Sequence, residues 1–241
     1  VTDSRPILSL LDMMRSDSAT EIIDFSSDEE KSSKPKPKPK PKPNKDRNPY
    51  YGDLHVHTKH SFDAYIFGVT ATPNDAYRYA KGEGIMHPMG YEMKLQEPLD
   101  FYSVTDHGFF MGMLNAWADT STDISQKDFA KPFHDLNEVE NITPESAGPR
   151  SALFSTILGG TITEPYSDLS PNVLKAWLTK NTQAALRSFD YEIHKSAWED
   201  VAKAANEHND PGYFTTFIGY EFTTSTNIEG GNLHRNVIFN S

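Results

Sequence analysis

The pattern of apolar and polar positions divides the chain near residue 48. Before that point the apolar residues form small clusters among serines and aspartates, without the period of a helix or a strand. After it, short apolar runs alternate with amphipathic segments, an order typical of α/β proteins. The sequence therefore predicts a disordered tail over residues 1–47, followed by one folded domain over residues 48–241.

Within this domain, apolar runs and helix-capping signals locate the expected elements. The apolar runs predict strands at residues 53–57, 99–105, 213–220 and 233–239. Thr72, followed by Pro73, is a good N-cap for a helix that ends near Gly82. Further helices are expected at residues 170–187 and, from the capping box Ser196–Glu199, at residues 196–207. The alternation is lost over about 109–195, which predicts a long insertion.

Charge is distributed unevenly between the tail and the domain. The formal net charge is −11, but residues 31–47 hold eight of the 23 basic residues and one of the 34 acidic ones. The other residues therefore carry 15 basic against 33 acidic side chains, a balance of −18. A body this acidic repels nucleic-acid phosphates and attracts metal cations, so bulk nucleic-acid binding is not expected.

Composition narrows the chemistry and leaves the cellular location open. The chain has no cysteine, which excludes thiolate metal sites and disulfides. No apolar run approaches the length of about 18 residues that a membrane span needs. Residues 34–43 alternate lysine and proline, which predicts an extended spacer. Such a tether before a catalytic body is compatible with export, either periplasmic or secreted, and the oligomeric state is not readable.

Two histidines on the first predicted strand are the first candidates for metal ligands. His55 and His57 are two residues apart, so their side chains leave the strand from one face. They can therefore reach the same ion. Asp53 is on that face too, and its carboxylate can orient one imidazole from behind.

Three further motifs stand at or beside later strands. They are Asp106-His107 after the second strand, Glu221 after the third, and His234-Arg235 at the start of the fourth. In a parallel α/β barrel the C-terminal ends of the strands converge on one site. His107 and Glu221 fit that rule together with the first two histidines, whereas His234 stands at the wrong end of its strand.

The four motifs in this order resemble those of the PHP (polymerase and histidinol phosphatase) superfamily, and most of all its branch known as domain of unknown function 3604. The resemblance covers residues 48–241 and includes an insertion after the second motif. It implies a distorted (β/α)7 barrel of the TIM type that holds two or three divalent transition metals, namely zinc, manganese or iron. It also implies a metal-dependent hydrolase, most of all a phosphoesterase acting on a small phosphorylated or other ester substrate.

The resemblance also suggests a role for each motif residue. His55 and His57 match the ligands of the first metal, and Glu221 matches the carboxylate that bridges the first and second metals. His234 is the candidate ligand of the second metal. Asp63 and His107 match ligands of a third, with Asp106 beside them as support or ligand. Arg235 is a candidate for neutralising a substrate phosphate.

The family's late Asp-x-His motif has no candidate in this sequence, so the expected barrel is incomplete and the chain reads as an N-terminal portion. Two alternatives to a phosphoesterase therefore stay open. One is a binding or scaffold module that keeps a partial PHP fold without catalysis. The other is a metal hydrolase of amides or non-phosphate esters, because related barrels use the same ligand types.

Overall fold

The computed structural model describes residues 47–157, 187–224 and 233–239. Most of the predicted tail and the helix expected at residues 170–187 lie outside these ranges. Among the described residues, no helix is both long and apolar enough to cross a membrane.

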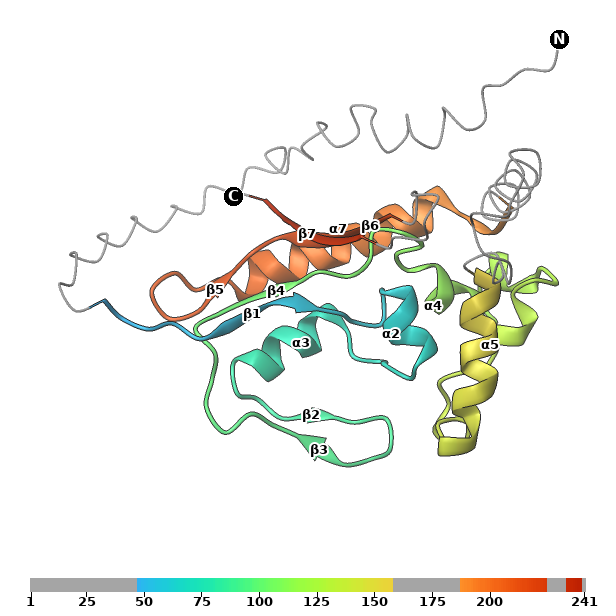
Figure 1. The fold of residues 1–241 in the computed structure, drawn as a ribbon, viewed down its shortest axis with the longest axis horizontal. Coiled ribbons are helices and arrows are strands. Elements are labelled where there is room, and N and C mark those ends of the chain that lie inside the picture. The colour runs from blue at the N-terminus through green and yellow to red at the C-terminus, as the bar shows by residue number, and fades with distance from the viewer. Residues whose placement is uncertain (1–46, 158–186, 225–232, 240–241) are drawn as a thin grey trace, which may run out of the picture. The chain divides into compact units, whose positions relative to one another are not determined.

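A parallel sheet of three strands forms the centre of the described fold (Figure 1). Its order is β1 (Gly52–Val56), β4 (Phe101–Val104) and β5 (Thr215–Thr216). Helix α3 (Pro73–Ala80) lies between β1 and β4 in the chain, and helix α7 (Tyr191–His208) precedes β5. Parallel strands joined through helices confirm the α/β class. The described strands do not close on one another, so the barrel remains an expectation.

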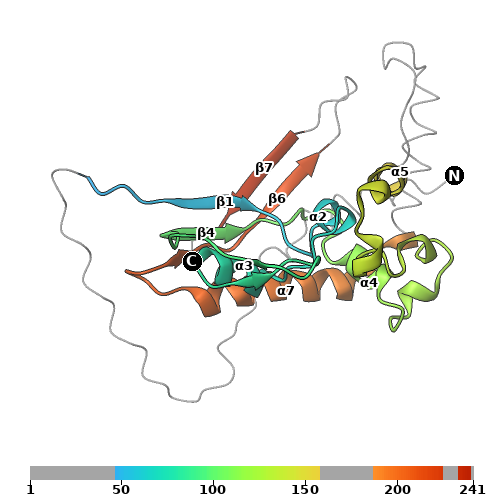
Figure 2. The same cartoon turned by 90° about the horizontal axis from the view of Figure 1, so that it is seen from below.

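The last two strands form a separate antiparallel hairpin, β6 (Gly219–Thr224) with β7 (Leu233–Ile238). Figure 2 shows this hairpin crossing β1 and β4 at an angle. The strand expected at residues 213–220 is thus divided into β5 and β6, and Glu221 lies inside a strand instead of after one. Gly219 permits the close approach of β7, since a Cβ there would lie 2.9 Å from Val237 O.

Local capping decides where the helices begin. Thr72 and Asp75 form a capping box at the start of α3, as the sequence predicts. Helix α7 starts earlier than predicted, because Asp190 accepts hydrogen bonds from the backbone N–H groups of Glu192 and Ile193. The predicted cap at Ser196 is therefore wrong, and that residue lies within the helix. Between β1 and α3 the chain also forms a short helix, α2 (Phe62–Ile66), in a stretch for which the sequence predicts no helix.

The region after β4 forms short elements packed on α2. They are α4 (Met113–Ala118), four 3-10 turns and α5 (Ala147–Ile157). The 3-10 turns are η3 (Ile124–Gln126), η4 (Lys131–Phe133), η5 (Val139–Asn141) and η6 (Pro144–Ser146). Between α3 and β4, two short strands form the hairpin β2 (Ile85–Met86) and β3 (Glu92–Met93), in a stretch that the sequence pattern leaves irregular.

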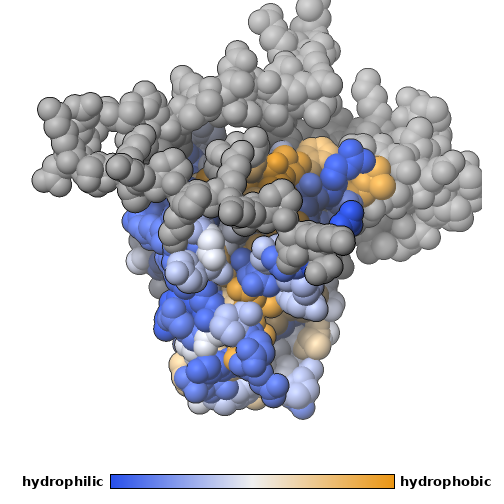
Figure 3. Space-filling model, turned by 90° about the vertical axis from the view of Figure 1, so that its left-hand side faces the viewer, coloured by the Kyte–Doolittle hydropathy of each residue, from blue (hydrophilic) through white to orange (hydrophobic). Residues whose placement is uncertain are grey.

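Two apolar clusters hold these elements together. One joins α3, α7 and the sheet, and its members are Ala76, Tyr77, Ala80, Tyr102, Val104, Met111, Ala197, Val201, Ala204, Ala205 and Phe214. The other joins α2, α4 and the turns that follow, and its members are Phe62, Tyr65, Ile66, Phe110, Met113, Leu114, Trp117, Ala118, Ile124, Ala130 and Phe133. The side of the molecule drawn in Figure 3 mixes hydrophilic and hydrophobic residues on its surface.

Gly112 connects the two clusters and offers a test of their packing. It has a φ of 76°, and a Cβ on it would lie 2.6 Å from the Cβ of Ala197 in α7. We expect Gly112→Ala to lower the free energy of unfolding by about 2–4 kcal/mol, because backbone strain and overpacking add. Urea unfolding followed by circular dichroism measures this loss.

Gly90→Ala is the matched control for that substitution. Gly90 also has a positive φ, 86°, but nothing lies within 4 Å of the added Cβ. It should therefore show only the backbone strain of about 1–2 kcal/mol. Equal losses in the two variants would contradict tight packing between Gly112 and α7.

Candidate metal centre

Glu221 is the centre of a cluster of four histidines. Its side chain is 1% exposed. Its Oε2 lies 3.1 Å from His55 Nε2, 2.8 Å from His57 Nε2 and 3.5 Å from His107 Nδ1. Its Oε1 contacts His234 Nδ1. The two carboxylate oxygens therefore face different imidazoles.

Asp63 lies on the other side of His57 and His107. Its Oδ1 is 3.1 Å from His57 Nδ1, and its Oδ2 is 3.2 Å from His107 Nε2. The six candidate ligands form three overlapping groups in which one donor atom from each residue lies within 4.8 Å of the others. These groups are His55, His57 and Glu221; His57, Asp63 and His107; and His107, Glu221 and His234.

Parallel strands and one antiparallel hairpin bring five of the six residues together, and helix α2 supplies Asp63. His57 and His107 follow the C-terminal ends of the paired strands β1 and β4. Backbone hydrogen bonds hold Glu221 beside them: its N–H donates to Asp106 O at 2.9 Å, and its carbonyl accepts from Gly108 N at 3.0 Å. His234 stands opposite Thr223 in the β6–β7 register, so it shares a face with Glu221 although it begins a strand.

The spacing of the donor atoms suits ligands that share an ion. Two ligands on a tetrahedral metal with bonds of about 2.1 Å are separated by about 3.4 Å. The nitrogen–oxygen distances of 2.8 to 3.5 Å in this cluster are close to that value. In addition, His57 Nε2 is buried and has no hydrogen-bond partner among the described residues, although Glu221 Oε2 is near. The residues present thus fit a transition metal, whose preferred ligands are imidazole and carboxylate.

The charges of the cluster keep its carboxylates ionised. Burial raises the pKa of Glu221, but the imidazoles of His107, His55 and His234 outweigh it and leave that pKa lowered. Burial also raises the pKa of Asp63, and the hydrogen bonds from His107, His57 and Ser61 lower it much further. Ionised carboxylates at neutral pH are what cation binding requires.

The carboxylates in turn raise the pKa of His57. Burial lowers the pKa of His57, but the hydrogen bond and charge of Asp63, with the charges of Asp106 and Glu221, leave it raised. The raised pKa favours the protonated imidazole of His57. A metal ion at Nε2 would displace the proton from that nitrogen, because a ligating imidazole nitrogen must be unprotonated.

The carboxylate of Asp106 binds Thr58 and lies outside the three ligand groups. Its buried carboxylate accepts hydrogen bonds from the N–H and the hydroxyl of Thr58, the hydroxyl at 2.7 Å. It belongs to none of the three ligand groups among the described residues. Burial raises its pKa despite these bonds. The predicted role of Asp106 as support therefore stays a prediction, and its position gives no support to a role as ligand.

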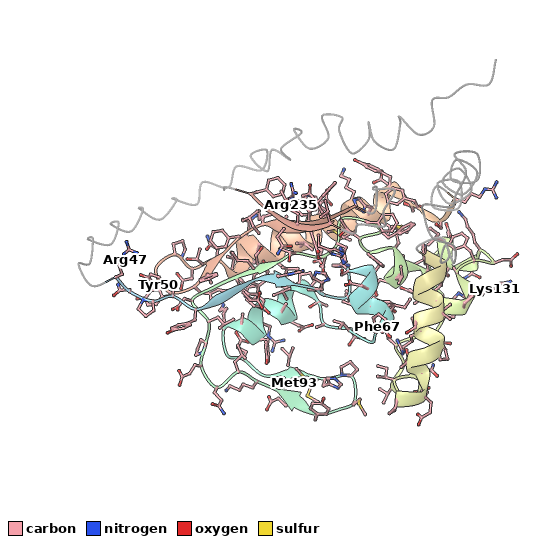
Figure 4. The ribbon with its side chains drawn as sticks, viewed as in Figure 1. Arg47, Tyr50, Phe67, Met93, Lys131 and Arg235 are labelled. Carbon is pink, nitrogen blue, oxygen red and sulfur yellow. The ribbon has the colours of Figure 1, made fainter. Side chains whose placement is uncertain are left out.

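Arg235 and Asp53 are placed away from their predicted partners. Arg235 pairs with Phe222, so strand alternation puts it on the face opposite His234. It is labelled in Figure 4 on β7, on the side away from β1 and α2, and this position gives no support to phosphate binding at the cluster. Asp53 is an exposed residue that accepts a hydrogen bond from the backbone N–H of His55 at 2.9 Å, where an imidazole partner was expected.

Several polar residues of the site are not evident from sequence spacing. Ser61 Oγ lies 3.1 Å from His57 Nδ1 and accepts a hydrogen bond from His107 N. Thr223 Oγ1 lies 2.6 Å from His107 Nδ1. In the sequence, only the spacing from a recognised ligand could have indicated such a residue. Thr223 follows Glu221 by two residues and so shares its face of the strand.

His60, by contrast, is not the solvated loop residue that its position suggests. It is 8% exposed, and its Nε2 lies 2.8 Å from Asp200 Oδ2 on α7. The pair joins the loop after β1 to that helix, outside the three ligand groups.

Comparison with known proteins gives the family of this chain. Neither the curated proteins nor the solved structures provide a match. A family model described as "Protein of unknown function (DUF3604)" matches residues 44–241, which is most of the chain. This chain therefore belongs to the DUF3604 family, and its cluster of histidines, Glu221 and Asp63 can hold metal ions.

Proposed function

We propose that this chain carries the metal centre of a PHP-type hydrolase and that its substrates are phosphoesters. The observation that carries the proposal is Glu221, a carboxylate 1% exposed and surrounded by four imidazoles from three separate segments of the chain. Burying Glu221 and His107 together costs free energy unless such groups are paired or hold a metal. His57 Nε2 favours the metal, because it is buried 2.8 Å from Glu221 Oε2 and yet makes no hydrogen bond among the described residues.

The residues suggest how two or three divalent ions, zinc, manganese or iron, would be held. His55, His57 and Glu221 would hold one ion, and Glu221 with His234 would hold part of a second. Glu221 suits a bridging role because its Oε2 faces the first pair of imidazoles while its Oε1 faces His234. Asp63 and His107 would serve a third. Bound divalent metals acidify a water molecule and neutralise charge on a phosphoester.

Exposure indicates where a substrate would approach. The side chains of His55 and His234 are 57% and 40% exposed, whereas those of His107 and Glu221 are 3% and 1% exposed. The cluster is thus open on the side of β1 and β7 and closed on the side of β4. A substrate would enter beside His55, and the buried residues would keep the ligand geometry fixed.

Metal content and hydrolysis together test the proposal. We expect the purified chain to retain at least one transition metal per molecule by elemental mass spectrometry. We also expect the metal-loaded chain to hydrolyse bis(4-nitrophenyl) phosphate or 4-nitrophenyl phosphate faster than 4-nitroacetanilide or 4-nitrophenyl acetate. His55→Ala should lower metal content and reduce kcat/KM on the order of 100-fold, because it removes a direct ligand.

His87→Ala is the control, since His87 stacks on Tyr91 in the β2–β3 hairpin and belongs to none of the ligand groups. It should match the wild type in both measurements. Unchanged metal content and hydrolysis in His55→Ala would refute the proposal. Faster cleavage of the anilide or of the carboxylate ester would show that the substrates are amides or non-phosphate esters and not phosphoesters.

A further inference from the structure

The imidazole of His107 belongs to two of the ligand groups, the one with Asp63 and the one with Glu221 and His234. Its Nε2 faces the first group and its Nδ1 faces the second. Its Nε2 lies 3.2 Å from Asp63 Oδ2. Its Nδ1 lies 3.5 Å from Glu221 Oε2 and 2.6 Å from Thr223 Oγ1. The ring is 3% exposed, so water has little access to either nitrogen.

The chemistry of imidazole limits which nitrogen of His107 can bind a metal. A neutral imidazole binds a metal through its unprotonated nitrogen, while the other nitrogen carries a proton that needs an acceptor. At Nδ1 the hydroxyl of Thr223 is within hydrogen-bond distance, and the carboxylate of Glu221 is not. Asp63 Oδ2 is within hydrogen-bond distance of Nε2, so either nitrogen has an acceptor for the proton while no metal is bound. With a metal at Nε2 beside Asp63, the proton would stand on Nδ1 and be donated to Thr223 Oγ1.

The backbone fixes Thr223 in this position. It lies two residues after Glu221 on β6, so both side chains leave the same face of the strand. Its pairing with His234 across the hairpin holds it opposite another ligand of the cluster. The hydroxyl is thus held by the same strand that supplies the central carboxylate.

We propose that Thr223 is a positioning residue that accepts the Nδ1–H of His107 and so assigns the Nε2 of His107 to the metal beside Asp63. This inference rests on the metal-binding function proposed above. It excludes His107 from the ligands on the Glu221–His234 side. Partners of this kind fix both the tautomer and the orientation of a ligating histidine, and their loss weakens metal affinity 10- to 100-fold.

Nitrogen NMR of the zinc-loaded chain reads the tautomer directly. Long-range proton–nitrogen spectra of ¹⁵N-labelled protein distinguish a metal-bound nitrogen from a protonated one, and His107→Gln identifies the His107 signals. In the wild type we expect a protonated Nδ1 and a zinc-bound Nε2. In Thr223→Val that pattern should be lost and zinc should bind 10- to 100-fold more weakly, whereas Thr223→Ser should restore both.

Thr216→Val is the matched control for losing a buried threonine hydroxyl. Thr216 donates to the carbonyl of Ala205, away from the cluster, so its loss should lower stability without changing the His107 signals or zinc affinity. If the wild type binds zinc through Nδ1, or if Thr223→Val matches it, the inference about Thr223 fails and the metal centre stands. A wild type that takes up no zinc, manganese or iron would overturn both.

Discussion

Glu221→Gln is expected to abolish the stabilisation of this chain by divalent transition metals. In the wild type, a metal at about 100 times its dissociation constant should raise the free energy of unfolding by about 2.7 kcal/mol. The variant keeps the size of the side chain but removes the charge that faces His55, His57 and His234. Its melting temperature should therefore not change when zinc or manganese is added.

Thermal unfolding across a metal titration measures this effect, with elemental mass spectrometry on the same samples. Glu207→Gln is the control, because Glu207 is an exposed residue of α7 that pairs with Lys203 at 3.8 Å. It should keep the full metal-dependent rise. A similar rise in Glu221→Gln would show that this carboxylate is not a central ligand.

Arg150→Met is expected to lower the free energy of unfolding by about 3–5 kcal/mol. Arg150 is 4% exposed, and its guanidinium donates to the backbone carbonyls of Ile66, at 2.7 Å, of Leu136, and of Asn141, at 3.0 Å. It also donates to the side chain of Asn137 at 2.9 Å. Methionine fills similar space but leaves buried acceptors without a donor, which is the costly way to break such a network.

The same substitution tests whether the region after β4 supports the metal centre. Ile66 belongs to α2, the short helix that also carries Asp63, so losing Arg150 should loosen that ligand. Urea unfolding measures the stability, and Arg78→Met is the control. Arg78 is an exposed residue with ion pairs to Asp75 and Glu83, and its loss should cost less than about 1 kcal/mol. Equal losses in the two variants would contradict a structural role for Arg150.

Much of the candidate site was predictable because it depends on local spacing. Two histidines two apart on a strand must share a face, and the structure brings His55 and His57 to one carboxylate oxygen. The cap at Thr72 was predictable for the same reason, since all its partners lie within one turn. Neither result depends on a residue far away in the sequence.

Other residues could not be assigned from spacing because their partners are distant in the sequence. The neighbours of Arg150 in the sequence do not indicate a buried guanidinium, because its acceptor on Ile66 lies 84 residues earlier. His60 reads as a loop residue until α7 brings Asp200 to it. A hydrophobic pattern shows which face of an element is buried, but it does not show which element covers that face.

The sequence by itself predicted the α/β class and named the six candidate ligands that the structure brings close together. Only the tertiary structure decided how these ligands are grouped. The antiparallel pairing of β6 with β7 brings His234 from the start of its strand to Glu221 and turns Arg235 away. The parallel bridge between His107 and Glu221 brings Thr223 to His107. Strand register is the physical reason, because a shift of one residue moves every side chain to the opposite face, and contacts far apart in the chain set that register.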